Sequence, residues 1–244
     1  MKSIRTSLLA AAMTLGLSYT AGAQALATFG SAEAAGLGEG SALLGTSMTA
    51  GHLGWGPVIS LIGQTYRYRD GANSHAQAWA LSPSVGLHYA MPEGSVQAAV
   101  GYTFVNTDVP VSIIGVETGS ENSTFVSAQA NYWGSGENTA QAIASWGFKS
   151  EYYWTRLRAA HRLAPSATPF YVGAELVVQG SQKDLVVPVF GTSSAPMRYE
   201  VGPTIEYRFT PEFRMGASGG LRGGNNNAVN TGYARIEFLL LSKL

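Results

Sequence analysis

The sequence has no cysteine, few charged residues and, after residue 23, no long apolar run. The absence of cysteine excludes a disulfide scaffold and any thiolate metal site. Charged residues make up 12% of the chain, and 15 Lys and Arg balance 15 Asp and Glu. This balance gives no reason to expect a nucleic-acid partner. A membrane-spanning helix after residue 23 is excluded because no apolar run there reaches the length of about 18 residues that spanning requires.

The N-terminus has the organisation of a secretory signal peptide. Met1–Arg5 is short and basic, Leu8–Leu17 is apolar, and Ala21–Ala23 has the small-x-small pattern of a cleavage site. The apolar run is shorter than the roughly 20 residues of a membrane-spanning helix, which argues against an uncleaved anchor. The sequence therefore predicts a signal peptide at residues 1–23. Residues 24–40 are rich in Ala and Gly and are interpreted as a flexible leader.

From residue 41 to residue 244 the dominant hydropathy period is two. In the segment 198–209, Tyr199, Val201 and Ile205 share one face while charged residues occupy the other. Alternation of this kind is typical of β-strands with one oily and one polar side. The pattern predicts an all-β fold with twelve strands (ten is the alternative count), at about 41–51, 57–69, 77–90, 95–105, 110–118, 123–133, 138–149, 152–163, 169–180, 196–209, 212–222 and 230–241.

These strands suit a membrane barrel better than a soluble β-sandwich, which is the alternative. They run to about nine to thirteen residues, the length that a tilted strand needs to cross a bilayer. Aromatic residues collect at their ends, as in the girdles of outer-membrane barrels. A closed antiparallel up-and-down transmembrane β-barrel at residues 41–244 is therefore expected, located in the bacterial outer membrane with lipid around it. Closure is required because hydrocarbon cannot satisfy the backbone of an open sheet edge.

An even strand count also predicts on which side of the membrane each connection lies. Short turns are expected in the periplasm and longer loops outside. Counting from residue 41 places the long connection Ser181–Ala195 on the outer side, and Ala164–Ala167 and Thr210–Glu212 in the periplasm. The same count places Met91–Gly94 outside, as an unusually short loop.

The candidate functional residues are charged side chains on the polar faces of the later strands. If consecutive strands are neighbours, they form one sector of the lumen: Arg156, Arg158, Arg162, Glu175, Arg198, Glu200, Glu206, Arg208, Arg214, Arg222, Arg235 and Glu237. One interpretation is a lumen that faces a solute or a glycan, because guanidinium groups suit hydroxyls and carboxylates. The other is a self-neutralising network that fills a narrow barrel, which the near balance of signs favours.

Motifs for catalysis or for metal binding are not found. The histidines, His52, His75, His88 and His161, have no metal-ligand spacing, and neither a Gly-x-Ser-x-Gly motif nor a paired-carboxylate motif is present. The alternation places His88 on a polar face and His161 on an apolar face near a strand end. No catalytic residue, metal or cofactor is therefore predicted.

One hairpin resembles a known family. Ser145–Arg158, with Tyr153-Trp154-Thr155-Arg156-Leu157-Arg158 after a short turn, resembles the aromatic, Tyr-Trp-x-Arg-x-Arg hairpin of the cellulose biosynthesis protein BcsS family. Val100–Tyr102 with Gly115–Glu117 is similar to that family's Gly-Tyr and Gly-Val-acidic strands, and Val201–Pro203 and Gly219–Gly224 are compatible with it. The Pro-containing insertion near Val187 departs from it. The resemblance implies an outer-membrane barrel associated with cellulose or exopolysaccharide production and supplies no catalytic residues.

Three functions follow as hypotheses. The first is a non-catalytic barrel that supports exopolysaccharide biosynthesis or secretion, with a polysaccharide or the cellulose-secretion machinery as its partner. The second is a generic narrow porin for small solutes. The third is an outer-membrane lipid-modifying enzyme, which would need a Ser/His pair or a similar dyad that spacing does not place.

Overall fold

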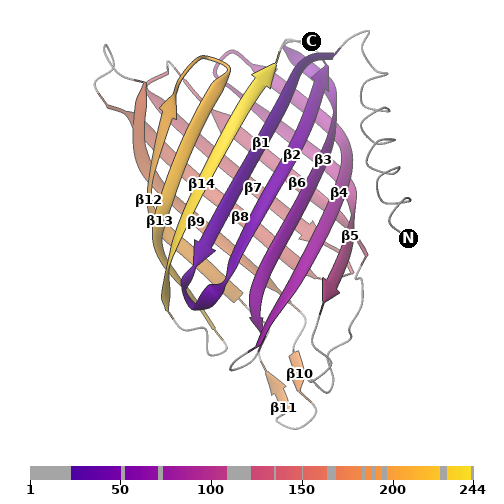
Figure 1. Ribbon diagram of the computed structural model, residues 1–244. Coiled ribbons are helices and arrows are strands. Elements are labelled where there is room, and N and C mark those ends of the chain that lie inside the picture. Colours follow the sequence, from indigo (N-terminus) through magenta and orange to yellow (C-terminus); the bar gives the residue numbers. More distant parts are fainter. Residues whose placement is uncertain are drawn as a thin grey trace, which may run out of the picture.

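The chain folds into a closed antiparallel barrel (Figure 1). The computed structural model describes residues 23–50, 53–70, 74–108, 122–134, 136–149, 151–163, 169–182, 185–187, 191–193, 197–225 and 230–242. In this part of the chain the barrel has twelve strands: β1 (Ala23–Ala35), β2 (Gly40–Ala50), β3 (Gly54–Asp70), β4 (Ser74–Met91), β5 (Gly94–Asp108), β6 (Ser123–Tyr132), β7 (Asn138–Gly147), β8 (Tyr152–Arg162), β9 (Phe170–Ser181), β12 (Met197–Arg208), β13 (Phe213–Gly224) and β14 (Thr231–Ser242). The predicted fold class and strand count are confirmed.

The first strand lies where a flexible leader was predicted, and that prediction is wrong. Residues 23–35 form β1, and Gly36–Gly38 form a 3-10 turn, η1, that leads into β2. β1 closes the barrel by pairing with β14 from Leu26↔Ser242 to Ala35↔Tyr233. The physical reason is that a barrel in lipid must satisfy both edges of its sheet, so the weakly patterned first segment is recruited as the closing strand. The strand predicted at 110–118 lies outside the described residues, and β5 pairs directly with β6.

The added strand changes the side of the membrane assigned to the early connections. Both the first residues of β1 and the last of β14 lie at one end of the barrel, here called the periplasmic end. Met91–Gly94 turns at this end, so its prediction as an outer loop is corrected, and its short length now agrees with the rule for periplasmic turns. Thr210–Glu212 also turns there, whereas Ala164–Ala167 lies outside the described residues. The connection from β9 to β12, with the hairpin β10 (Leu185–Val187) and β11 (Gly191–Ser193), lies at the opposite, outer end (Figure 1).

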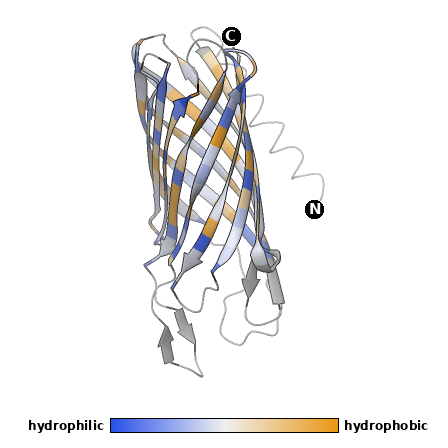
Figure 2. Ribbon diagram, turned by 90° about the vertical axis from the view of Figure 1, so that its left-hand side faces the viewer, coloured by the Kyte–Doolittle hydropathy of each residue, from blue (hydrophilic) through white to orange (hydrophobic). Residues whose placement is uncertain are grey.

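The strands present an apolar side outward and a polar side inward. On β4, Val85 and Leu87 are exposed on the outside while Ser84 and His88 are buried inside. Hydrophobic and hydrophilic residues alternate along the strands in Figure 2. Aromatic rings collect near the periplasmic end, where Tyr207 and Phe209 have ring centroids 4.6 Å apart. No helix in the described residues is long and apolar enough to cross a membrane. An apolar exterior on a closed barrel instead suits strands that cross the bilayer.

The first prediction concerns this architecture. We expect the mature protein from an outer-membrane fraction to resist SDS and to migrate differently on a gel before and after boiling. The reason is that the closed backbone network leaves no edge at which the detergent can begin to unfold the sheet. Gel mobility with and without heating measures the effect. A single mobility, with the protein soluble in the periplasm, would contradict a membrane barrel.

Candidate functional site

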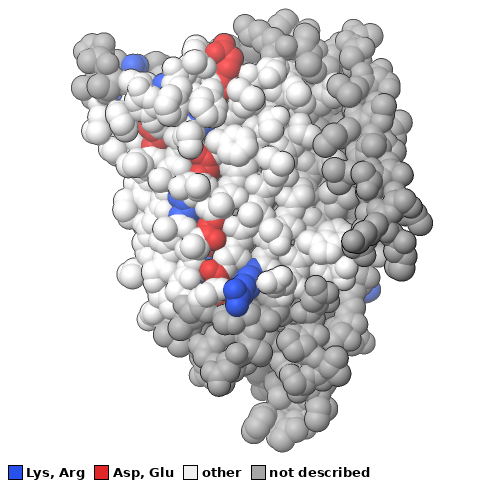
Figure 3. All heavy atoms as spheres, viewed as in Figure 1, with Lys and Arg blue, Asp and Glu red and all other residues white. Residues whose placement is uncertain are grey.

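Charged side chains gather on one half of the inner wall. In the barrel order, β8, β9, β12, β13, β14 and β1 are consecutive neighbours, and these six strands with η1 carry the network of ion pairs. Figure 3 shows a column of charged atoms along this side of the barrel, among residues that are mostly uncharged. The described residues of the network are seven arginines and six glutamates, Arg156, Arg158, Arg198, Arg208, Arg214, Arg222, Arg235, Glu33, Glu39, Glu175, Glu200, Glu206 and Glu237.

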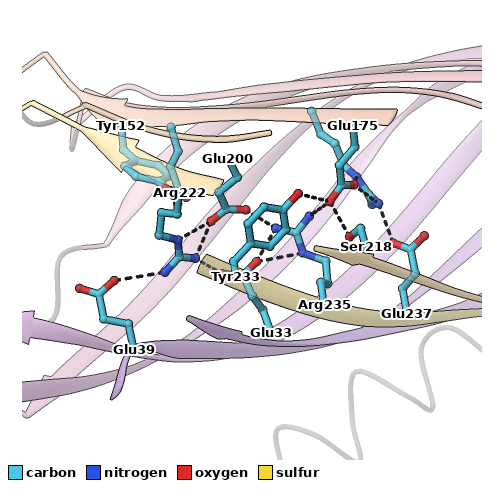
Figure 4. A network of polar contacts seen from close by, with 12 residues as sticks. Glu33, Glu39, Tyr152, Glu175, Glu200, Ser218, Arg222, Tyr233, Arg235 and Glu237 are labelled. Carbon is cyan, nitrogen blue, oxygen red and sulfur yellow. Dashed lines mark hydrogen bonds and ion pairs between the residues drawn. The ribbon is translucent and has the colours of Figure 1, made fainter. Parts of the chain in front are cut away.

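The outer part of the network is centred on Arg222 (Figure 4). Its Nε donates to Glu200 Oε1 at 2.8 Å, and its Nη1 donates to Glu39 Oε2 at 3.1 Å. It also pairs with Glu33, which pairs in turn with Arg235. The side chain of Glu200 is 1% exposed. Buried charges of this kind persist because each is paired and hydrogen-bonded on several sides.

The middle of the network is centred on Glu175 of β9. Its carboxylate accepts from Arg235 Nη1 at 2.7 Å and from Ser218 Oγ at 2.6 Å. Arg156 Nη2 lies 2.7 Å from Glu175 Oε2, and Tyr233 Oη donates to Glu175 Oε1 at 3.3 Å. The side chain is 0% exposed. Glu175 therefore joins strands that lie on both sides of β9 into one polar core.

The periplasmic part of the network is centred on Glu206 and Glu237. Glu237 accepts from Arg156 Nη2 at 2.7 Å and pairs with Arg158. Glu206 Oε1 accepts from Arg208 Nε at 2.8 Å and from Arg214 Nη1 at 3.4 Å. The guanidinium of Arg208 lies 4.1 Å from the centre of the Tyr171 ring, a cation–π contact.

The other half of the inner wall is uncharged along the described parts of β2 to β7. Strand register places Ser47, Ser60, Ser84, Gln97 and Gln129 among its inward residues. A hydrogen-bonding network joins Gln129, Gln141 and Asn131 there, with Gln141 Nε2 donating to Asn131 Oδ1 at 3.0 Å. The lumen thus has one ionic side and one side of small and amide-bearing residues.

The lumen is closely packed around several of its side chains. Val58 on β3 and Ala78 on β4, both on the uncharged side, are 1% and 3% exposed. Glu200 and Glu175 on the charged side are equally covered, whereas Gln97 and Gln129 on the uncharged side are half-buried. Water reaches the network mainly at its ends, where Arg198 and Arg214 have side chains 33% and 35% exposed.

The structure places most of the sequence-predicted residues in this network. It brings together eleven of the twelve residues that were predicted as a lumen cluster. The twelfth, Arg162, faces the lumen at the periplasmic end of β8, opposite Tyr171. Glu33 and Glu39 were missed because they lie in the segment interpreted as a leader. Glu33 lies in an alternating Ala-x-Glu-Ala context, a weak signal that became interpretable only once β1 was paired with β14.

Two of the histidines, His88 and His161, have side chains that the structure describes, and both lie on the faces that the alternation indicated. His88 is buried in the lumen near the periplasmic end of β4. His161 faces outward, and its Nδ1 lies 2.9 Å from Asn138 Oδ1 on β7. Within the described residues no hydrogen bond joins His161 to a serine, and no group of His, Asp or Glu is arranged to hold a metal ion.

A closed barrel with an apolar exterior and a charged interior decides the class of this protein. It is an outer-membrane β-barrel. No family model matches the chain, and no curated protein matches its sequence. Among solved structures, it is similar to an outer-membrane channel from Pseudomonas putida F1, with 12% identity over 91% of this chain and 96% of that chain and a TM-score of 0.56.

Two further solved structures are similar to the chain. One is from work on the in-meso crystallization of membrane proteins, with 10% identity over 90% of this chain and 84% of that chain and a TM-score of 0.50. The other is the toluene transporter TodX of Pseudomonas putida, with 10% identity over 92% of this chain and 90% of that chain and a TM-score of 0.47.

Proposed function

We propose that this barrel serves exopolysaccharide production as a non-catalytic component of the outer membrane that contacts the polymer at the open ends of its lumen. The observation that carries the proposal is the two-sided lumen. One side offers guanidinium groups and the other offers serine hydroxyls and amides, among them Ser60 and Gln141. Polysaccharides present dense arrays of hydroxyls, which such donors and acceptors suit.

The hairpin that resembles the cellulose biosynthesis protein BcsS family supports the same proposal. It is the β7–β8 hairpin, and the register places Trp146 and Tyr153 on the opposite side of the wall from Arg156 and Arg158. Trp146 and Tyr153 stack with ring centroids 6.5 Å apart on the outside, while Arg156 and Arg158 enter the ionic network. The hairpin thus anchors the lumen charges to a lipid-facing aromatic pair. Cellulose is the polymer that the resemblance implies.

The test is a clean deletion of the gene followed by measurement of surface glucan. We expect the amount of surface polysaccharide to fall several-fold, and a plasmid copy to restore it. A matched strain carries the copy with Leu53→Ala, a change at an exposed position away from the lumen, and should be restored equally. Unchanged surface polysaccharide in the deletion strain would refute the proposed function.

A narrow solute channel is the second candidate, favoured by the structural similarity to an outer-membrane channel. The packed lumen argues against a pore that is open at rest, because Glu175 and Glu200 occupy its middle and outer parts. We therefore expect purified, refolded protein in planar bilayers to be almost silent at low voltage. Steady conductance of porin size, seen with the wild-type protein, would favour the channel over the polysaccharide role.

A further inference from the structure

The charge of the network is not evenly distributed along the barrel axis. The outer and middle parts hold Arg156, Arg198, Arg222 and Arg235 with Glu33, Glu39, Glu175 and Glu200, a net charge of zero. The periplasmic part holds Arg158, Arg208 and Arg214 with only Glu206 and Glu237, a net charge of +1. The excess of positive charge therefore lies toward the periplasm.

Exposure is greatest at the two ends of the network, and Arg198 at the outer end is 33% exposed. At the periplasmic end, the side chains of Arg208 and Arg214 are 26% and 35% exposed, whereas Arg222 in the outer part is 6% exposed. Both exposed guanidinium groups share one carboxylate, that of Glu206. Each group therefore retains N–H donors that this carboxylate does not use, since a guanidinium carries five.

Two buried polar atoms in the described part of the chain have no hydrogen-bond partner, and both lie in the periplasmic half of the lumen. One is Arg158 Nη2, on a side chain that is 9% exposed, and the other is His88 Nδ1. Arg158 Nη2 lies 3.8 Å from Glu206 Oε2, beside the same carboxylate that Arg208 and Arg214 share. His88 belongs to β4, half-way round the ring from β12, so it faces this cluster from the opposite wall. An unpaired buried donor is costly, and a site that receives an acceptor relieves that cost.

We propose that the periplasmic end of the lumen binds a carboxylate-bearing saccharide, held by Arg208 and Arg214 with Arg158 behind them. This inference rests on the proposed function and specifies its substrate class, an acidic polysaccharide in place of the neutral cellulose that the family resemblance implies. A planar guanidinium matches a carboxylate with two parallel hydrogen bonds, and the low dielectric of a narrow lumen strengthens the attraction. The Tyr171 ring beneath Arg208 fixes the orientation of the guanidinium that meets the ligand.

The test is calorimetric titration of the refolded full-length barrel in detergent with matched trimers. Cellotriose and the same trimer oxidised at each C6 differ only at that carbon, where a neutral hydroxymethyl group becomes a carboxylate. Inorganic phosphate is the third probe. We expect the carboxylated trimer to bind at least roughly tenfold more tightly than cellotriose, and its affinity to fall as salt is added. Arg214→Gln should weaken its binding by roughly tenfold.

Arg67→Gln is the matched control, because it removes one positive charge from an exposed position on β3, outside the network. Its affinity for the carboxylated trimer should equal that of the wild-type protein. If Arg214→Gln fails the gel-shift test for folding, Arg208→Gln tests the same site. Equal affinity for the two trimers overturns the proposal, and so does phosphate that binds as tightly as the acidic trimer, since the ligand is then a small oxyanion. The deletion strain reports separately on the proposed function, because its surface polysaccharide does not depend on which trimer binds in detergent.

Discussion

Glu175→Gln is expected to destabilise the barrel by about 3–5 kcal/mol, the cost of removing one partner from a buried ion pair. The side chain of Glu175 is fully covered and pairs with both Arg156 and Arg235. Glutamine keeps its shape and some hydrogen bonding to Ser218, but it removes the negative charge that compensates two buried guanidinium groups. Urea unfolding of the refolded protein, followed by tryptophan fluorescence, gives the free energy of unfolding by linear extrapolation.

Glu212→Gln is the matched control for this experiment. Glu212 is an exposed residue of the periplasmic turn between β12 and β13, so the same chemical change should cost no more than about 0.5 kcal/mol. If the two variants lost the same free energy of unfolding, the lumen at Glu175 would be hydrated well enough to screen the lost charge. In that case the packed interior, and the closed resting state that it implies, would both be wrong.

The sequence predicts the strands whose two faces differ strongly in polarity. β12 is the clearest example, because Arg198, Glu200 and Glu206 alternate with Tyr199 and Val201 along a strand expected at 196–209 and found at Met197–Arg208. A slip of one residue there would place charges in lipid, so the pattern admits one register only. The same contrast identified eleven residues that the structure brings into the ionic network.

The strand β1 has no such contrast and could not be predicted in the same way. Ala27 and Ala35 face the lumen while Ala32 and Ala34 face outward, so side-chain polarity does not distinguish the two faces. Small residues are tolerated at both surfaces, and only the requirement for closure selects this segment as a strand. Because this strand was not counted, the Met91–Gly94 turn was assigned to the outer side of the membrane.

Ion pairs between residues far apart in the chain cannot be predicted from any local sequence pattern. Arg235 Nε donates to Glu33 Oε2 at 2.9 Å, between residues 202 positions apart in the chain. This contact exists because β14 pairs with β1, and the register Glu33↔Arg235 brings the two side chains directly opposite each other. Alternation indicates that both residues face inward, but the choice of partner depends on the order of strands around the ring.

Ile236→Arg is expected to destabilise the barrel by about 2–4 kcal/mol, the cost of a charged side chain at the bilayer midplane of an outer-membrane barrel. Ile236 lies at the middle of β14, faces outward and is 59% exposed. Its chain neighbours Arg235 and Glu237 face the lumen and belong to the network. Urea unfolding in lipid vesicles, rather than in detergent, measures the effect, because the cost arises from the bilayer.

Leu53→Arg is the control, since Leu53 is 65% exposed at the periplasmic end, where an added charge can reach water. Its cost should be at most about 1 kcal/mol, because the penalty falls steeply toward the membrane surface. Equal costs for the two variants would mean that Ile236 does not face lipid. The register of β14 would then be shifted by one residue, Arg235 and Glu237 would face outward, and the lumen network could not form. Measured together, the two substitutions therefore test the register of β14, on which both the apolar exterior and the charged interior depend.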